Sequence, residues 1–503
     1  MPIASPRVRR AGAVGSLFVP LDRGSAESLQ EQICAGLRQL VSSGALGPGT
    51  RLPSTRALAA ELDVSRTTAV AALLQLVEEG YLVARERSGT FVAADAAEAT
   101  RPEGRRPSPA APAAPTATSP LTLSRRGDEL ARAATALHSH DRRPRAFRVG
   151  RPALDAFPVR EWSRILARRA ARVTIAQLDY GEPSPELCAA IAELVSSARG
   201  MRVRTEQVLL FAGGQRALEF AVTAVLDPGE EAWMEDPGYP GARNVLGASG
   251  ARITSVPVDD QGMIVAAGEA AAPRARLVFV TPSCQFPLGV TMSDSRRREL
   301  LAWAERAGAC VVEDDYDAEF RHEGAQLAPL AALDPDRVLY TGSFSRTMFP
   351  AIRLGYLIAP VGMVERLRAA QAVLEDQLPW LFQVALADFI AEGHFARHLR
   401  RMRVLYRARR EAVLAAALAA GDRMRVRPSS SGLHLIADLP AGVDGAAVAA
   451  AAARRGVEAA PLSLFHADPR PRAALVLGFG AVDAASARAA MDELAAAIDQ
   501  AGS

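Results

Sequence analysis

The first hundred residues show a hydrophobic periodicity that changes from helical to alternating. Residues 25–43 carry an apolar side chain at every third or fourth position, which predicts a helix. Ser54 and Ser65 each precede a shorter run of the same kind, and serine is a favoured N-cap residue, so we expect two further helices to begin there. Residues 81–85 then alternate and residues 90–92 return after a turn, which predicts a hairpin. Three helices followed by a hairpin is the plan of a winged helix-turn-helix.

A different rhythm begins at about residue 145, where short apolar runs alternate with helical patterns. The runs lie at residues 232–236, 277–281, 309–314 and 338–340. Strands separated by helices favour a mostly parallel sheet covered on both faces, so the expected fold class of this part is α/β. Ligands of such sheets collect at the carboxyl ends of the strands.

Residues 95 to about 124, between these two patterns, have almost no large apolar side chains for a core. Six prolines lie between residues 102 and 120 among alanine, serine and threonine. Proline stiffens a chain and the lack of large apolar side chains prevents packing, which is typical of an extended linker. We therefore expect a first domain at 19–93, a linker at 94–144 and a second domain at 145–503.

Charge and cysteine content narrow the function classes. The formal charge of the 503 residues is only +3, so any nucleic-acid surface must be local. Four cysteines lie far apart without a Cys-x-x-Cys pair, which argues against a zinc site and a disulfide framework. The sequence has neither a signal-peptide pattern nor an apolar run of about 18 residues, so we expect a cytoplasmic protein with no membrane span.

The segment from Gly49 to Ala59, followed by Val64 to Thr68, resembles the DNA-binding domain of GntR-family transcription regulators over about residues 19 to 93. The resemblance implies a double-stranded DNA operator as partner. It also implies a set of residues that face DNA, namely Arg51, Arg56, Ser65, Arg66, Thr67 and Thr68, with the wing tip near Gly89 in the minor groove. Hydroxyls, arginines and amides at a helix start suit phosphate contacts. The alternative is a small helical domain with solvated arginines.

In the second domain, polar residues stand where predicted strands end. Gly214 and Gln215 open a predicted helix whose amides can meet a phosphate. Asp314 and Tyr316 follow one strand, and Ser343 follows another. Each signal alone is more typical of a turn or of a solvated strand end.

Four segments together resemble the aminotransferase-like domain of the MocR subfamily of GntR regulators, over about residues 145 to 495. They are Glu235–Pro240, Thr281–Pro287, Glu313–Asp317 and Ser343–Tyr356. The resemblance implies a homodimer and a fold-type-I domain related to aminotransferases that use pyridoxal 5'-phosphate (PLP). It implies cofactor contacts from seven residues: Asp314 to the pyridine nitrogen, Tyr316 to the ring 3-oxygen, Tyr239 on the ring face, and Ser343, Arg353, Gly214 and Gln215 at the phosphate.

Two positions depart from the family pattern. Cys284 stands where the family usually has histidine, and Arg346 stands where it has the lysine that forms a Schiff base with PLP. A guanidinium stays protonated and cannot form that imine. The chain contains no lysine at any position. Arg470 and Arg472 are candidates for a substrate-carboxylate clamp, although a solvated surface position is the favoured role for both.

These observations leave three hypotheses. The first is a transcription regulator whose effector-binding and dimerisation domain senses a small molecule, such as PLP, an amino acid or a related adduct, without turnover and with PLP held non-covalently at most. The second is a PLP-dependent aminotransferase with a DNA-binding appendage. The third is a cofactor-free dimerisation scaffold. The absence of lysine argues against the second, because transimination normally passes through a lysine.

Overall fold

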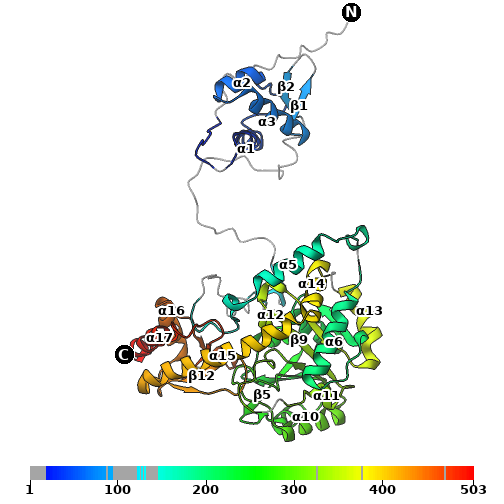
Figure 1. Ribbon diagram of the computed structural model, residues 1–503, viewed down its shortest axis with the longest axis vertical. Helices are drawn as coiled ribbons and strands as arrows, with labels where there is room; N and C mark the ends of the chain where they lie inside the picture. The colour runs from blue at the N-terminus through cyan, green and yellow to red at the C-terminus, as the bar shows by residue number, and fades with distance from the viewer. Residues whose placement is uncertain are drawn as a thin grey trace, which may run out of the picture. The chain divides into compact units, whose positions relative to one another are not determined.

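The computed structural model describes two compact units, one within residues 1–119 and one within residues 120–503 (Figure 1). The described residues are 19–25, 27–85, 89–93, 122–124, 126–128, 130–131, 145–179, 181–324, 327–374, 378–468 and 472–502. Most of the predicted linker, the wing turn at 86–88 and Arg470 lie outside these residues.

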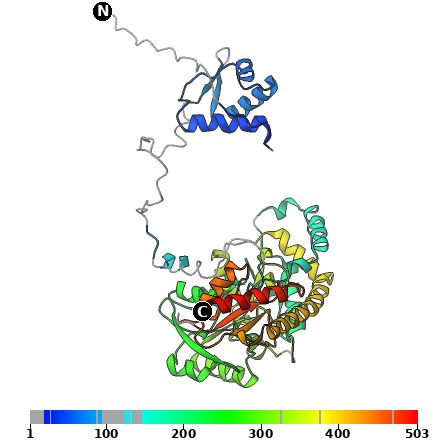
Figure 2. The same ribbon diagram turned by 90° about the vertical axis from the view of Figure 1, so that its left-hand side faces the viewer.

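The N-terminal unit consists of three helices and a hairpin, as predicted (Figure 2). The elements are α1 (Leu29–Ser42), α2 (Thr55–Glu61), α3 (Arg66–Glu78), β1 (Leu82–Arg85) and β2 (Gly89–Val92), and the two strands pair antiparallel. Ser54 and Ser65 accept hydrogen bonds from the backbone N–H groups of Ala57 and Thr68 at 3.2 and 3.0 Å, which confirms both predicted caps. The first helix begins at Leu29, later than predicted, because Ser28 forms a capping box with Glu31.

The core of this unit lies between α1 and the other two helices. Ile33 and Leu37 of α1 pack with Leu58 of α2 and with Leu73 and Leu76 of α3, and all five are buried. Full burial of one such side chain stabilises a fold by about 1.5–3 kcal/mol. The helical spacing in the sequence therefore marked the packed face of α1, whereas in α3 Leu74, which fits the same spacing, is 57% exposed.

The second unit is built on an eight-stranded sheet. Its strands are β3 (Val208–Phe211), β4 (Glu231–Asp236), β5 (Arg252–Asp259), β6 (Gly262–Met263), β7 (Leu277–Val280), β8 (Cys310–Asp314), β9 (Val338–Ser343) and β10 (Gly355–Ile358). They are ordered β3-β10-β9-β8-β7-β4-β5-β6. Only β10 and β6 run against the others, which confirms a mostly parallel sheet.

Two hydrophobic cores cover the two faces of this sheet. Val278 and Val311 belong to one core, and their neighbours Phe279 and Val312 belong to the other. Successive side chains of a strand point to opposite faces, so apolar runs such as β7 require cover on both sides. The helices around the sheet are α5 (Val159–Ala170), α6 (Pro185–Arg199), α7 (Gly214–Val225), α8 (Pro240–Ala248), α9 (Val265–Ala271), α10 (Asp294–Ala307), α11 (Leu330–Leu333), α12 (Phe344–Thr347), α13 (Val364–Leu374) and α14 (Trp380–Ala391).

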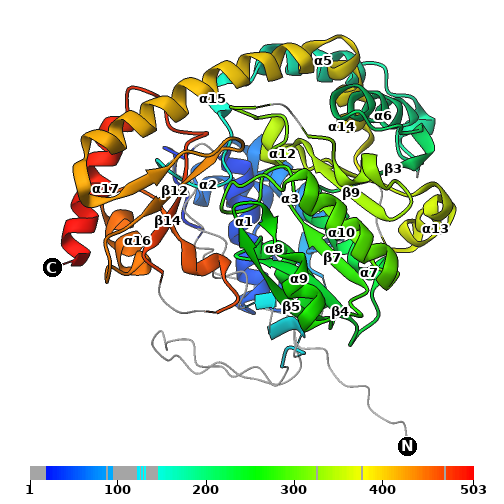
Figure 3. The ribbon, with the colours of Figure 1, turned by 90° about the horizontal axis from the view of Figure 1, so that it is seen from below.

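A smaller lobe completes the second unit. It contains an antiparallel sheet in the order β11-β12-β14-β13 and three helices. The strands are β11 (Arg425–Arg427), β12 (His434–Asp438), β13 (Ala460–Pro461) and β14 (Ala474–Gly478), and the helices are α15 (His394–Ala419), α16 (Gly445–Arg454) and α17 (Ala487–Gly502). Figure 3 shows α15 running along the outside of the unit from α14 to the smaller sheet. Within the described residues, no helix has the length and apolar character needed to cross a membrane.

Candidate functional site

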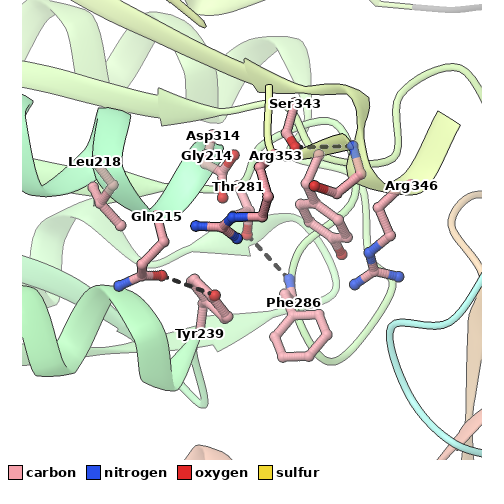
Figure 4. A pocket seen from close by; sticks show the side chains of 12 residues that line it. Gly214, Gln215, Leu218, Tyr239, Thr281, Phe286, Asp314, Ser343, Arg346 and Arg353 are labelled. Carbon is pink, nitrogen blue, oxygen red and sulfur yellow. Dashed lines mark hydrogen bonds between the residues drawn. The ribbon is translucent and has the colours of Figure 1, made fainter. Parts of the chain in front are cut away.

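A cavity of about 210 Å³ opens at the carboxyl ends of the parallel strands (Figure 4). It is lined by Gly214, Gln215, Leu218, Tyr239, Thr281, Phe286, Asp314, Tyr316, Ser343, Ser345, Arg346 and Arg353. The seven residues that the resemblance assigned to a cofactor thus line one cavity together with Arg346. Leu218, Thr281 and Phe286 were not singled out from the sequence, although the last two lie inside a motif segment.

One end of the cavity combines a helix N-terminus, a hydroxyl and a guanidinium. Gly213, with φ of 97°, leads into α7, and a Cβ on it would lie 3.3 Å from the guanidinium of Arg353. A Cβ on Gly214 would lie 3.3 Å from Cβ of Ser343. Arg353 itself adopts a left-handed φ of 50°. Backbone amides, a hydroxyl and a guanidinium at close range form a donor set that suits a phosphate.

Tyr239 and Gln215 form the neighbouring wall. The Tyr239 hydroxyl donates to Oε1 of Gln215 at 3.0 Å, and Nε2 of Gln215 donates to the Gly241 carbonyl at 2.9 Å. Burial raises the pKa of Tyr239 to about 12, so its hydroxyl stays protonated at neutral pH. The chain of bonds fixes the Tyr239 ring beside the cavity.

Asp314 is the carboxyl group of the cavity wall. It ends β8 and accepts a hydrogen bond from Oγ1 of Thr341 at 3.3 Å. Burial, and then the neighbouring Asp315, raise the pKa of Asp314 to about 7. A cation placed against this carboxyl group would favour its ionised form, which is the relationship expected with a protonated ring nitrogen.

Tyr316 connects the cavity to Cys284. The Tyr316 hydroxyl donates to Sγ of Cys284 at 3.5 Å, and burial raises the pKa of that thiol to about 11. The guanidinium carbon of Arg346 lies 5.2 Å from the centre of the Tyr316 ring, a cation–π distance. A neutral thiol therefore occupies the position that the resemblance associates with histidine.

Arg346 belongs to the short helix α12. Ser343 caps this helix by accepting a hydrogen bond from the Ser345 N–H at 3.1 Å. Its Nη1 lies 3.4 Å from Oδ2 of Asp317, a carboxylate whose side chain is fully buried. Burial opposes the charge, but Asp317 and Tyr316 outweigh it and raise the pKa of Arg346. A permanent cation therefore lines the cavity, and Figure 4 shows it at the edge away from Gln215.

The proposed carboxylate clamps do not line this cavity among the described residues. Arg472 pairs with Asp468 at 3.9 Å. Arg470 lies outside the described residues.

The residues assigned to DNA lie at the start of α3, in α2, in the segment before α2 and at the hairpin. Arg51, Arg56, Ser65, Arg66, Thr67 and Gly89 are exposed and Thr68 is half-buried. The Ser65 hydroxyl lies 2.7 Å from the hydroxyls of both Thr67 and Thr68. A Cβ on Gly89 would lie 3.3 Å from Nε of Arg51, so this arginine reaches the hairpin.

Some arginines of this unit form ion pairs within it and others do not. Arg23 pairs with Asp63, and Arg38 pairs with Glu79, each at 2.7 Å. Within the described residues, Arg66 has neither a hydrogen bond nor an ion pair through its side chain. Its charge is therefore free to meet a phosphate or a base edge.

Comparisons with known proteins agree with both units. Residues 29–92 match the family of bacterial regulatory proteins of the gntR type, and residues 147–495 match aminotransferase class I and II. The probable rhizopine catabolism regulatory protein MocR of Rhizobium meliloti is 36% identical over 489 residues, covering 95% of each chain. The HTH-type transcriptional regulator TauR of Rhodobacter capsulatus is 35% identical over 453 residues, covering 89% of this chain and 92% of its own.

A solved structure matches the second unit. LysN, an alpha-aminoadipate aminotransferase from Thermus thermophilus complexed with N-(5'-phosphopyridoxyl)-L-leucine, superposes with a TM-score of 0.66 at 27% identity. The match covers 73% of this chain and 97% of LysN. The chain therefore belongs to the MocR-type regulators of the GntR family, which join a helix-turn-helix domain to an aminotransferase class I and II domain.

Proposed function

We propose that this protein is a DNA-binding transcription regulator whose second domain binds an anionic small molecule at the 210 Å³ cavity without turning it over. PLP, an amino acid or an adduct of the two is the proposed ligand class. Its relatives MocR and TauR are named as regulators, which supports the first half of the proposal. The second half rests mainly on the convergence of Arg353, Ser343 and the α7 N-terminus at one end of the cavity.

The residues present fit PLP as the bound group. Ser343, Arg353 and the amides of Gly214 and Gln215 would hold its phosphate, and Asp314 would face its ring nitrogen. When bound, PLP supplies a protonated ring that withdraws electrons from attached groups. LysN, whose structure contains a phosphopyridoxyl amino acid, shows that this fold accommodates a ligand of that class in a relative.

We propose that the protein does not turn its ligand over, because Arg346 cannot act as a Schiff-base residue. We infer that it stands at the Schiff-base position of the aminotransferases, where it supplies a fixed charge in place of a neutral amine. Asp317 holds that charge beside the cavity. No lysine elsewhere in the chain is able to substitute.

Retention of PLP through dialysis tests whether the cavity binds this ligand, and product analysis tests whether the protein catalyses turnover. We expect the purified protein to retain a PLP chromophore through dialysis, and we expect Arg353→Gln to lose it while Arg488→Gln, on the remote α17, does not. If neither wild type nor the Arg488→Gln control retains PLP, the result would favour the hypothesis of a cofactor-free dimerisation scaffold. Formation of a keto acid that depends on added amino acid would establish the aminotransferase instead.

A further inference from the structure

A second, much smaller cavity is lined in part by the stretches of chain that also border the first. Its volume is about 10 Å³, close to that of one water-sized sphere. Three arginines and three hydroxyls dominate its lining, which consists of Arg199, Ser283, Thr291, Arg297, Ala318, Arg321, Leu327 and Ser431. The described residues at this cavity therefore offer mainly hydrogen-bond donors.

Arg199 has more donors than acceptors available to it. Its side chain is only 3% exposed, and its Nη2 contacts Asp315 at 2.5 Å and Ser283 Oγ at 2.9 Å. Its Nε and Nη1 are buried without a hydrogen-bond partner. A buried donor without an acceptor destabilises the fold, and more so when it is charged. The position thus requires a further acceptor.

Arg321 presents the same imbalance from another segment. Its Nη1 donates to Oγ1 of Thr291 at 3.3 Å, while its buried Nε has no partner. Because Ser283 accepts from Arg199, its own hydroxyl proton remains free to donate.

Arg297 adds a charge whose hydrogen bonds go to neutral carbonyls, although Glu313 and Asp315 lie near enough to favour it. It is fully buried, and its donors reach the backbone carbonyls of Met292, Ala328 and Pro282 at 3.0, 2.9 and 2.9 Å. Among the described residues, Asp315 is the carboxylate that forms an ion pair with these three guanidiniums. Burial raises the pKa of two further carboxyl groups near the cluster, Glu313 and Glu319, to about 7, so at neutral pH they offset its charge only in part. A neutral water would satisfy a donor but would leave the remaining positive charge.

We propose that this cavity binds a single small inorganic anion of chloride size. An anion accepts from the free N–H groups of Arg199 and Arg321 and offsets the unpaired charge of the cluster in a low-dielectric interior, where charge pairing is strongest. The cavity volume excludes an anion as large as a sugar phosphate.

The anion site and the larger cavity share segments of chain. Ser283 precedes Cys284, Asp315 lies between Asp314 and Tyr316, and Ser431 forms an isolated β-bridge with Arg321. The segment before β12 is thereby joined to the loops that follow β7 and β8. An anion at this junction stabilises the smaller lobe against the larger sheet.

Thermal unfolding of the whole chain tests the proposal. Sodium chloride replaces sodium gluconate at constant ionic strength, and we expect the melting temperature to rise with the logarithm of chloride concentration above the Kd. Arg321→Gln should abolish this dependence, whereas Arg488→Gln on the exposed face of α17 should retain it.

Two further measurements keep the test decisive if Arg321→Gln does not fold. Ser283→Ala, which removes the hydroxyl that is free to donate, should raise the chloride Kd by roughly fivefold, the loss expected for one hydrogen bond. Crystals soaked in bromide should show one anomalous peak within hydrogen-bond distance of Arg199. Equal melting temperatures in chloride and gluconate, or an empty anomalous map at this cavity, would mean that the cavity holds only water and would overturn the proposal.

Discussion

The guanidinium of Arg346 lies 3.4 Å from the carboxylate of Asp317, and the same carboxylate oxygen accepts from the backbone N–H of Leu433 at 3.3 Å. Asp317 thus contacts both α12, which follows strand β9 of the larger sheet, and the residue before β12 in the smaller lobe. Because its side chain is fully buried, the pair is shielded from solvent on the Asp317 side. The charge that lines the ligand cavity is therefore fixed by a contact that also connects the two lobes.

The first prediction concerns the start of α3. Arg66→Ala should weaken operator binding by roughly 1–3 kcal/mol, since an exposed, unpaired arginine at a recognition helix is available to a base or phosphate. The measurement is a gel-shift titration at fixed salt on a duplex that the wild-type protein has selected from a random library. Arg38→Ala, which removes an arginine paired with Glu79, is the matched control. Equal affinities of Arg66→Ala and wild type would remove α3 from the DNA interface.

Local features of the fold could be predicted from the sequence because interactions between residues close in the chain determine them. Ser54 and Ser65 were identified as caps, since a serine before an apolar helical pattern satisfies the first free N–H groups. Asp314 and Ser343 were placed together because parallel strands end at one edge of a sheet.

Contacts between distant segments were not accessible in the same way. Asp317 and Arg346 are 29 residues apart, and Arg199 and Asp315 come from different elements, so neither pair follows from a period or a spacing. The position of β10 between β3 and β9 was not predicted either, because an apolar run in the sequence indicates a strand but not its neighbours in the sheet.

The second prediction concerns assembly. We expect a homodimer, as the family resemblance implies, and apolar side chains exposed in the single chain mark candidate contacts. Ile175 is 89% exposed and Leu178 is 75% exposed. Ile175→Asp combined with Leu178→Asp should shift the protein toward monomer in light scattering at micromolar concentration. Arg488→Asp, at an exposed polar position of α17, is the control. A monomeric wild type would contradict the prediction.

The third prediction uses the buried carboxyl group of Glu235. Its Oε2 accepts from the Thr281 hydroxyl at 2.7 Å, its Oε1 has no partner, and burial raises its pKa to about 7. Because the folded state holds this proton more tightly than the unfolded state, the contribution of Glu235 to stability is lost as pH rises from 4.5 to about 7.

Glu235→Gln removes that titration. The stability of the variant relative to wild type should therefore increase between pH 4.5 and 7 and then level off, by about 3 kcal/mol in total. Urea unfolding at a series of pH values measures the difference. Glu193→Gln, at an exposed position on α6, should show no such slope. A difference that does not change with pH would show that the folded and unfolded states bind this proton equally, so that folding does not raise the pKa of Glu235.

The last prediction concerns the charge at the ligand cavity. Arg346→Lys would introduce the single lysine of the chain, so a borohydride-reducible PLP adduct found by peptide mapping away from the N-terminal amine must lie at this position. We expect the variant to gain the absorbance band of an imine, distinct from that of PLP held non-covalently by wild type, because a neutral amine replaces a guanidinium that cannot form an imine. Adding Asp314→Ala should weaken the band by removing the carboxyl group that faces the ring nitrogen.

The same variant separates the sensor from the scaffold. Arg353→Lys serves as the control, since it places a lysine at the phosphate end of the same cavity, where no imine band is expected. If Arg346→Lys folds and dimerises but shows no band at saturating PLP, the cavity does not hold PLP with its reactive carbon toward α12. Loss of PLP retention in wild type as well would then leave the second unit as a dimerisation scaffold.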